Sequence, residues 1–299
     1  MVCLVSNLIS IIILLMVISR KVSLWCLVAL ILLSFGLYVI SRNSFPNLLR
    51  VSFLDIGQGD AIFIEAPNGS QFIIDGGPDN NLLKELGKVM PFFDHTIDGI
   101  MVTNDDSDHY SGFIGMLDRY STAIEFESGT KKESTLFDLY KDKLSKHGVK
   151  QLLAKRGMRI VLDKESKVYL DIIFPDRDVS NLATNDGSIV AKLVYGDTSI
   201  MLQGDSPSKI EHYLVGQGIN LKADILKLGH HGSRTSTSEE YVREVDPRYA
   251  VAMLGASNHY GFPHKETLST LNNLSIPFLR TDLMGTITFI SNGTSWKGL

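Results

Sequence analysis

The segment TNDDSDHYSG, residues 103–112, concentrates the side chains best suited to hold a metal ion. Three carboxylates and one histidine fall between Asn104 and His109, directly after the apolar run IDGIMV at 97–102. Carboxylate oxygens and imidazole nitrogens are the usual ligands of hydrolytic metal centres, where a divalent ion activates water near neutral pH. The spacing therefore predicts a metal-binding loop at the end of a strand.

Two later segments supply further ligands. QGDS at 203–206 contributes Asp205, and LGHHGS at 228–233 contributes His230 or His231, each after an apolar run. Asp108 and His109 are adjacent, so only a loop or a helix start could direct both towards one ion. A helix that begins there also points its amide groups towards anions. Asp108, His109, Asp205 and one of the two later histidines would make a four-ligand set with water as the nucleophile.

Ordinary structural roles are the alternative for each of these side chains. Asp106 and Asp108 could form Asx turns and a helix N-cap. His230 and His231 could be hydrogen-bonded residues of a loop. Each residue taken alone is compatible with either interpretation.

Strand-like and helix-like runs alternate through the chain beyond residue 50. RVSFLDIG and DAIFIEAP predict strands joined by a Gly-rich turn, and NGS predicts a hairpin before the strand QFIID. Hairpins followed by alternating strands and helices indicate a mixed sheet covered by helices, in the α/β class. We expect one domain over 50–299 after a linker at 42–49. Further strands are expected at 97–102, 168–175, 188–196, 199–205, 223–229 and 249–254, and helices at 80–90, 110–120, 207–216 and 264–274.

Two apolar runs without charge, residues 4–19 and 22–40, precede this domain. Crossing a bilayer takes roughly 20 apolar residues, so we expect two transmembrane helices within 1–41. A cleaved signal peptide is the alternative for the first run, although it lacks basic residues at its start, and a buried helical hairpin is the alternative for both. Arg20 and Lys21 place the link between the runs in the cytoplasm by the positive-inside rule. This predicts a two-pass protein of the cell membrane with an extracytoplasmic soluble domain, although Arg42 and Arg50 argue for the opposite orientation.

The soluble part is acidic, with one basic exception. The first fifty residues hold four basic groups and no acid, which leaves 25 basic and 33 acidic residues in the remainder. Both cysteines, Cys3 and Cys26, lie in the apolar runs, so the soluble part offers no thiolate ligand and no disulfide. Residues 131–167 carry eleven Lys or Arg against five acids. A solvated helical face is the simple interpretation of this basic segment, and an electrostatic guide for a polyanion is the other.

The motifs FLDIGQGDAIFI, IIDGG, the acidic loop, LQGDS, LKLGHHGSRTSTSEE and NHYGFPHKETL follow the order seen in metallo-β-lactamase-fold hydrolases. Over residues 50–292 the chain most resembles the soluble domain of ComEC-type DNA-uptake (competence) proteins. The resemblance implies a metallo-β-lactamase-like αββα sandwich. It also implies that Asp75 of IIDGG orients the metal loop and that Asp205 bridges two metal ions.

In such relatives the acidic loop reads His-x-Asp-x-Asp-His, and Asn104 stands here in place of the first histidine. A neutral carbonyl oxygen at that position suits Mn²⁺ or Mg²⁺ better than Zn²⁺. We expect a divalent metal cofactor, Zn²⁺ or Mn²⁺, with one or two ions bound. The metal ligands expected from the resemblance are Asn104, Asp106, Asp108, His109, Asp205, His230 and His231.

Further residues are expected to serve the substrate. His264 of GFPHKE matches a histidine that closes the active-site rim in ComEC-like relatives, where it could hold a phosphate oxygen or protonate a leaving group. We expect Asp108 and His264 to take part in catalysis, and Ser233, Arg234 and Asn258 to contact phosphate.

These features favour a membrane-anchored, metal-dependent hydrolase of phosphodiesters, and the resemblance implies a DNA nuclease associated with DNA uptake. Two spans cannot form a DNA channel, so a separate channel protein is an expected partner. Two alternatives remain open. The loss of the histidine at Asn104 could mark a catalytically degenerate metal-binding module in a DNA-uptake or envelope assembly, or the substrate could be another phosphodiester.

Overall fold

The computed structural model of the chain describes residues 22, 24–36 and 47–298. It contains two units, Met1–Pro46 and Asn47–Leu299. In the first unit residues 24–36 are helical. Among the described residues no helix is both long and apolar enough to cross a membrane. The transmembrane hairpin expected at 1–41 falls largely outside the described residues and stays a prediction.

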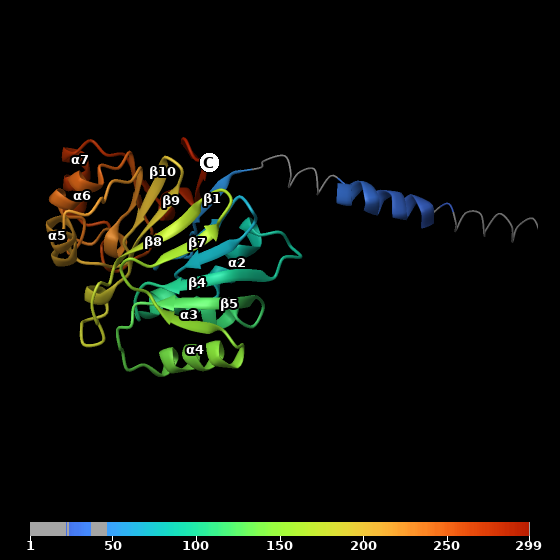
Figure 1. Ribbon diagram of the computed structural model, residues 1–299, viewed down its shortest axis with the longest axis horizontal. Coiled ribbons are helices and arrows are strands. Elements are labelled where there is room, and N and C mark those ends of the chain that lie inside the picture. Colours follow the sequence, from blue (N-terminus) through green and yellow to red (C-terminus); the bar gives the residue numbers. More distant parts are fainter. Residues whose placement is uncertain (1–21, 23, 37–46, 299) are drawn as a thin grey trace, which may run out of the picture. The chain divides into compact units, whose positions relative to one another are not determined.

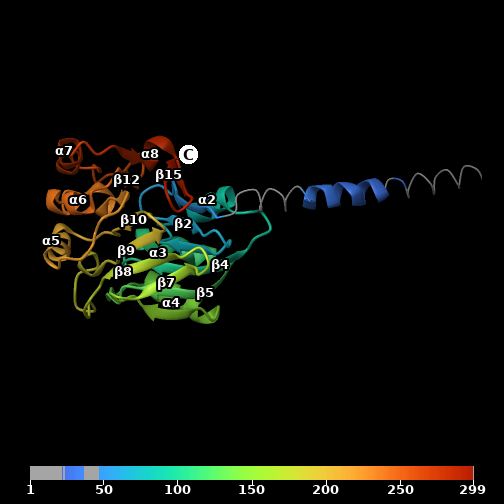
Figure 2. The ribbon, with the colours of Figure 1, turned by 45° about the horizontal axis from the view of Figure 1, so that its top comes forward.

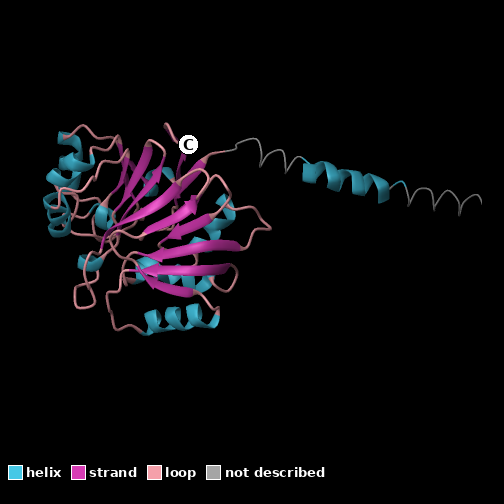
Figure 3. Cartoon of the chain, in the orientation of Figure 1, coloured by secondary structure: helices cyan, strands magenta, loops and turns pink. Residues whose placement is uncertain are grey.

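The second unit is built on two sheets that face each other (Figure 3). Within the described residues the first sheet has eight strands in the order β15–β14–β1–β2–β3–β4–β5–β6. Neighbours from β15 to β3 run antiparallel, and β3, β4, β5 and β6 run parallel. The strand bounds are Trp296–Gly298 (β15), Ile287–Ser291 (β14), Leu49–Phe53 (β1), Ile62–Glu65 (β2), Gln71–Ile74 (β3), Thr96–Val102 (β4), Ser121–Glu127 (β5) and Lys150–Leu153 (β6).

The second sheet has seven strands in the described part of the chain, in the order β13–β12–β11–β10–β9–β8–β7. Strands β10 to β13 run parallel, and β7 to β10 alternate in direction. The strand bounds are Phe278–Arg280 (β13), Tyr249–Ala252 (β12), Ile225–Lys227 (β11), Thr198–Leu202 (β10), Val190–Tyr195 (β9), Val168–Phe174 (β8) and Arg159–Asp163 (β7).

Helices cover the outer face of each sheet (Figures 1 and 2). One apolar cluster lies between the sheets, a second lies under α2, α3 and α4, and a third lies under α5, α6 and α7. This is the αββα sandwich that the sequence predicted. The bounds of the helical elements are Asn81–Val89 (α2), Ser107–Met116 (α3), Thr135–Lys146 (α4), Ser208–Gly216 (α5), Glu239–Val245 (α6), Lys265–Asn273 (α7) and Thr281–Met284 (α8), with 3-10 turns at Asn185–Gly187 (η1) and Gly229–Gly232 (η2).

Local sequence explains most of these elements. The predicted NGS hairpin joins β2 to β3, with Gly69 at φ 87°, a backbone conformation that favours glycine. The run IDGIMV falls within β4, and its last four residues are buried, as expected of a parallel strand covered on both faces. Strands β5, β6 and β7, which the sequence did not predict, lie before and after α4 along the charged middle of the chain.

The direction of the parallel strands positions the candidate site. Because carboxyl ends of neighbouring parallel strands meet at one edge, the loops after β3, β4 and β5 leave the first sheet together. The loops after β10 and β11 leave the second sheet together in the same way. Four of the segments singled out in the sequence, at 75–77, 103–109, 203–206 and 228–233, therefore occupy strand ends.

Candidate metal centre

Helix α3 presents the first two ligand candidates. It begins at Ser107, earlier than the sequence suggested, so that Asp108 and His109 lie in its first turn. The helix packs closely against the turn after β3, where the backbone N–H of Gly112 donates to the carbonyl of Gly77 at 2.9 Å. A Cβ at Gly112 would lie 1.9 Å from the carbonyl oxygen of Gly76, so only glycine allows this approach.

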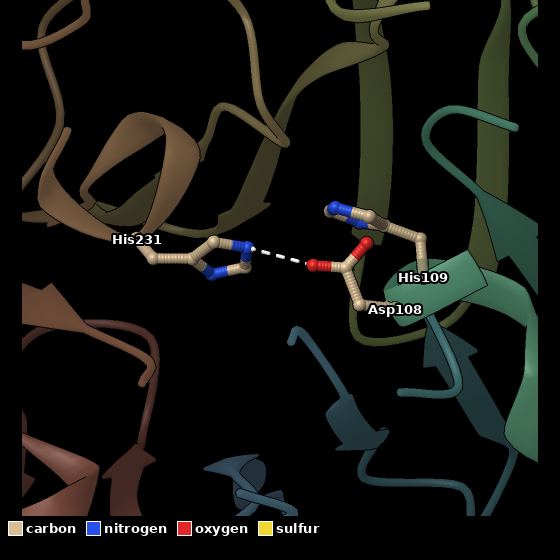
Figure 4. Close-up of side chains that lie close together, drawn as sticks. All are labelled: Asp108, His109 and His231. Atoms are coloured by element: carbon tan, nitrogen blue, oxygen red, sulfur yellow. Dashed lines mark ion pairs between the residues drawn. The ribbon is translucent and has the colours of Figure 1, made fainter. Parts of the chain in front are cut away.

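The other two ligand candidates come from the second sheet. Asp205 follows β10, and His231 lies in η2 after β11. Both His230 and His231 have left-handed backbone conformations, with φ of 47° and 55°. This conformation is costly for a residue with a side chain, and it is found mainly where the surroundings over-determine it. It turns the imidazole of His231 towards α3, as Figure 4 shows.

Two overlapping groups of donor atoms result. Asp108, His109 and His231 offer one group, and Asp60, His109 and Asp205 offer the other, with the donor atoms of each group within 4.8 Å of one another. The Oδ2 atom of Asp108 lies 3.4 Å from Nε2 of His231. The Oδ2 atom of Asp205 lies 3.2 Å from Nε2 of His109 and 3.7 Å from Nε2 of His231.

Neighbouring groups fix the orientation of both imidazoles. Nδ1 of His109 lies 2.9 Å from Oδ2 of Asp75, whose carboxylate also accepts from the backbone N–H and the hydroxyl of Thr103, both at 2.7 Å. Nδ1 of His231 donates to the carbonyl of Met253 at 3.0 Å. Each ring therefore directs Nε2 into the cluster, the arrangement by which proteins orient metal-binding histidines.

A buried lysine lies inside the cluster. Lys227 and Asp60 are each 1% exposed and form an ion pair. The Lys227 ammonium also donates to the carbonyl of Gly204 at 2.9 Å and lies 4.0 Å from Oδ1 of Asp205. Burial alone would raise the pKa of Asp60, but the charges of Lys227 and then His231 outweigh it and lower that pKa. Asp60 is therefore held ionised by a cation that belongs to the protein.

Opposite charges also outweigh burial in setting the pKa values of Asp108, His231 and His109. Burial would raise the pKa of Asp108, yet the hydrogen bond with His231 and the charge of His109 lower it to about 2. Burial would lower the pKa of His231, yet Asp205 and then Asp60 raise it to about 10. The pKa of His109 is raised well above its usual value by Asp205 and Asp75 against the same effect of burial. A metal ion must therefore displace protons from both imidazoles, which makes its affinity depend on pH.

The donor set fits a divalent cation. Oδ1 of Asp205 is buried and has no hydrogen-bond partner within the described residues, and the Nε2 atoms of His109 and His231 face carboxylate oxygens at 3.2 to 3.7 Å. Native structures rarely leave a buried polar atom unpaired, so this oxygen is available to a cation or a water molecule. Two imidazoles with two or three carboxylates are compatible with Zn²⁺ and with Mn²⁺.

Asn104 and Asp106 are engaged elsewhere in the structure. The Oδ1 atom of the buried Asn104 accepts from the backbone N–H of Asp106 at 2.8 Å, which forms an Asx turn. The carboxylate of Asp106 contacts Nζ of Lys132 at 2.5 Å and accepts from the hydroxyl of Thr184 at 2.9 Å. Neither residue belongs to the two donor groups found among the described residues.

His230 and His264 both lie near the cluster, but their imidazole rings contact different groups. Nε2 of His230 lies 3.8 Å from Oδ2 of Asp205, but its side chain is 27% exposed and lies outside both donor groups of the described residues. His264 is the N-cap residue of α7 and makes no side-chain capping bond. Its Nδ1 accepts from the backbone N–H of Arg234 at 3.1 Å, so the neutral ring carries its proton on Nε2.

The other residues expected to contact substrate serve the loops that carry them. Asn258 donates to the carbonyls of Gly255 and Phe262, both at 3.1 Å, and accepts from the backbone N–H of Phe262. The hydroxyl of Ser233 pairs with that of Thr235 at 3.0 Å. Arg234 remains 62% exposed.

Two residues of the cluster, Asp60 and Lys227, were not expected from the sequence. Each carried a signal, because Asp60 directly follows the glycine turn of GQGD and Lys227 is the one charge inside the apolar run ILKLG. A charged residue that is fully buried needs a partner of opposite charge. That rule could have linked the two positions.

The ligand candidates and Lys227 lie within a stretch of the chain that matches known proteins. Residues 54–255 match the model of the Metallo-beta-lactamase superfamily. ComE operon protein 3 of Bacillus subtilis is 30% identical over 262 residues, which cover 80% of this chain and 33% of that protein. Competence protein ComA of Neisseria gonorrhoeae is 28% identical over 253 residues, which cover 81% of this chain and 32% of that protein.

A similar fold occurs among solved structures. Igni18, described as a novel metallo hydrolase from the hyperthermophilic archaeon Ignicoccus hospitalis, superposes with a TM-score of 0.52 at 14% identity, covering 81% of this chain and 98% of that one. At this identity the likeness concerns the fold alone. The chain spans about a third of the length of ComE operon protein 3 and of Competence protein ComA.

Proposed function

Because the chain belongs to the metallo-beta-lactamase superfamily and gathers buried carboxylates and imidazoles at one end of its sandwich, we propose that it is a metal-dependent hydrolase of phosphodiesters that acts on DNA. One observation carries the proposal. His109 and His231, from facing sheets, both direct Nε2 towards the carboxylates of Asp108 and Asp205. Such a donor set suits a hydrolytic metal ion better than a structural one, because no thiolate takes part.

Each residue of the cluster then has a defined task. Asp108, His109, Asp205 and His231 would hold one divalent ion. When bound, the ion supplies Lewis acidity and activates water as a nucleophile. Asp75 keeps His109 in the tautomer that leaves Nε2 free as a ligand.

A single ion is the occupancy that the charges favour. Lys227 already supplies a positive charge between Asp60 and Asp205, where a second cation would otherwise be attracted. Asn104 and Asp106 are hydrogen-bonded within their own loop. We therefore expect one ion per chain, with the second position left to the lysine ammonium.

His264 is the candidate contact to a phosphate oxygen. Its Nδ1 accepts a backbone hydrogen bond, so the proton of the neutral ring sits on Nε2, and the side chain is half-buried beside the HHGS turn. An imidazole in this tautomer can donate a hydrogen bond from Nε2 to a phosphate oxygen of the substrate.

DNA is proposed as the substrate because two of the matched relatives are named for competence or for the ComE operon, and because the sequence resembles ComEC-type uptake proteins. The uncharged runs at 4–19 and 22–40 support anchoring in the cell membrane, with the catalytic domain outside the cytoplasm. A separate channel protein would be its partner.

The test combines metal content with cleavage. The purified chain should contain one equivalent of divalent metal and cleave single-stranded DNA in the presence of Mn²⁺. Asp205→Asn should lose both properties. Asp197→Asn, an exposed aspartate at the other end of β10, is the matched control and should keep both. Metal without cleavage would contradict DNA as substrate, and absence of metal in the purified chain would contradict the metal centre itself.

A further inference from the structure

A cavity of about 540 Å³ lies in the basic segment, beside the acidic loop. It is bounded by the loop after β5, by α4, by the end of β6 and by the turn after β8. Its charged lining consists of four cations and two acids: Lys131, Lys141, Lys155, Arg177, Glu127 and Asp178. The cavity is thus net positive in a domain that is otherwise acidic.

Two of the four cations are not held in an ion pair. Lys141 pairs with Glu127 at 2.9 Å, and Arg177 pairs with the aspartate that precedes it at 2.8 Å. Lys131 and Lys155 form no ion pair within the described part of the chain. Both are exposed and line the same cavity as Asp178, whose charge acts on both. Neither ammonium group is held in an ion pair, so both can reach an incoming anion.

The cavity lies next to the candidate metal centre because of the strand order. Val102 pairs with Glu127 in the parallel ladder of β4 and β5, and Glu127 pairs with Leu153 in that of β5 and β6. The metal loop, the 128–131 loop and residues 154–155 therefore leave the sheet at the same edge in that order. Strands lie roughly 5 Å apart, so the cavity begins about one to two strand spacings from the metal loop.

The remaining walls are partly apolar. Phe137 is half-buried at the cavity and Leu153 is 47% exposed there, which leaves apolar surface in contact with the cavity. Inorganic phosphate alone would need no such surface. A nucleotide combines a phosphate for the two free ammonium groups with a flat base for an apolar wall, and base contacts of this kind tolerate any sequence.

We propose that this cavity binds the nucleotide adjacent to the scissile phosphodiester of a single-stranded polynucleotide, with Lys131 and Lys155 contacting its phosphate. This inference rests on the proposed function for the identity of the substrate. It makes binding of the strand independent of the metal, because none of the cavity's lining residues belongs to the metal cluster.

The experiment is fluorescence anisotropy of a labelled oligothymidylate with the full-length chain in EDTA. The variant combines Lys131→Ala and Lys155→Ala. The control combines Lys150→Ala and Lys164→Ala, two exposed lysines of the same segment that do not line the cavity. Loss of the contacts to one phosphate should lower the salt slope of binding by about 0.7 and weaken affinity ~5-fold at about 0.1 M salt. Equal affinities for the variant and the control would overturn the proposal.

Two further results separate the possible causes. Thymidine monophosphate should displace the oligonucleotide at lower concentration than inorganic phosphate, and equal potency would refute the contribution of the apolar wall. The assay contains no metal and so does not depend on cleavage. If the cavity variant loses binding while the unaltered chain cleaves no DNA, the hydrolase proposal fails and the binding site stands. If the chain cleaves DNA while the cavity variant binds it normally, the reverse holds.

Discussion

Replacement of Lys227 by methionine should destabilise the metal-free protein by about 3–5 kcal/mol. Lys227 and Asp60 are each 1% exposed and ion-paired, so removal of the ammonium leaves a buried carboxylate without its nearest counter-charge. The second carboxylate, Oδ1 of Asp205, lies 4.0 Å away. At that distance an effective dielectric constant of about 20 gives roughly 4 kcal/mol of attraction. Methionine keeps an unbranched apolar stem of similar length, so cavity formation adds little.

The assay is urea unfolding in the presence of a chelator, so that no metal can take the place of the lost ammonium. Asp60→Asn should restore much of the stability when it is combined with Lys227→Met, because the neutral amide no longer needs a cation. Lys192→Met is the matched control. Lys192 is a half-buried lysine on β9 that forms no ion pair among the described residues, and its replacement should cost less than about 1 kcal/mol.

Two outcomes would refute the reasoning. A cost for Lys227→Met no greater than that of Lys192→Met would mean that the buried cation is not needed to hold Asp60 ionised. A double variant no more stable than Lys227→Met alone would mean that the loss arose from packing and not from an uncompensated carboxylate. In either case the lysine could not be treated as the occupant of the second cation position.

Further predictions concern metal binding and pH. Asp108→Ala and His109→Ala should each abolish metal binding with little change in far-UV circular dichroism. His230→Ala is the control variant and should still bind metal. Normal metal binding by Asp108→Ala or His109→Ala would contradict the ligand assignment. Burial raises the pKa of Glu125 from 4.5 to about 7, even though Tyr140 donates a hydrogen bond to it. The folded protein therefore holds a proton that the unfolded chain releases, so stability should fall by about 3 kcal/mol as pH rises from 4.5 to 7. Glu125→Gln should remove this decline in urea unfolding, and parallel pH profiles for variant and parent would argue against it.

Much of the fold follows from local sequence signals. The NGS turn, the apolar run of β4 and the alternation of later strands and helices are present where they were predicted. The strands β5, β6 and β7 were not predicted, because they carry many exposed residues in a charged segment and their pairing depends on distant neighbours. Tertiary pairing outweighs local pattern in such strands.

The candidate site was only partly predictable for a similar reason. Residue types and spacing were enough to single out Asp108, His109 and Asp205. The choice between the two adjacent histidines depends on left-handed backbone angles that no sequence pattern specifies, and His231 is the one that belongs to a donor group among the described residues. The pairing of Asp60 with Lys227 joins the loop between β1 and β2 of the first sheet to β11 of the second, so it depends on the complete sandwich.

The ligand candidates are divided between the two sheets, since Asp108 and His109 follow a strand of the first and Asp205 and His231 follow strands of the second. An ion held by all four would act as a cross-link through the middle of the sandwich. The two sheets could then separate only after the ligands of one sheet had dissociated from the ion, so separation of the sheets would become a single cooperative event. Occupancy would in this way set the mechanical integrity of the domain as well as its chemistry, and a cell poor in the metal would hold a molecule whose halves separate more easily.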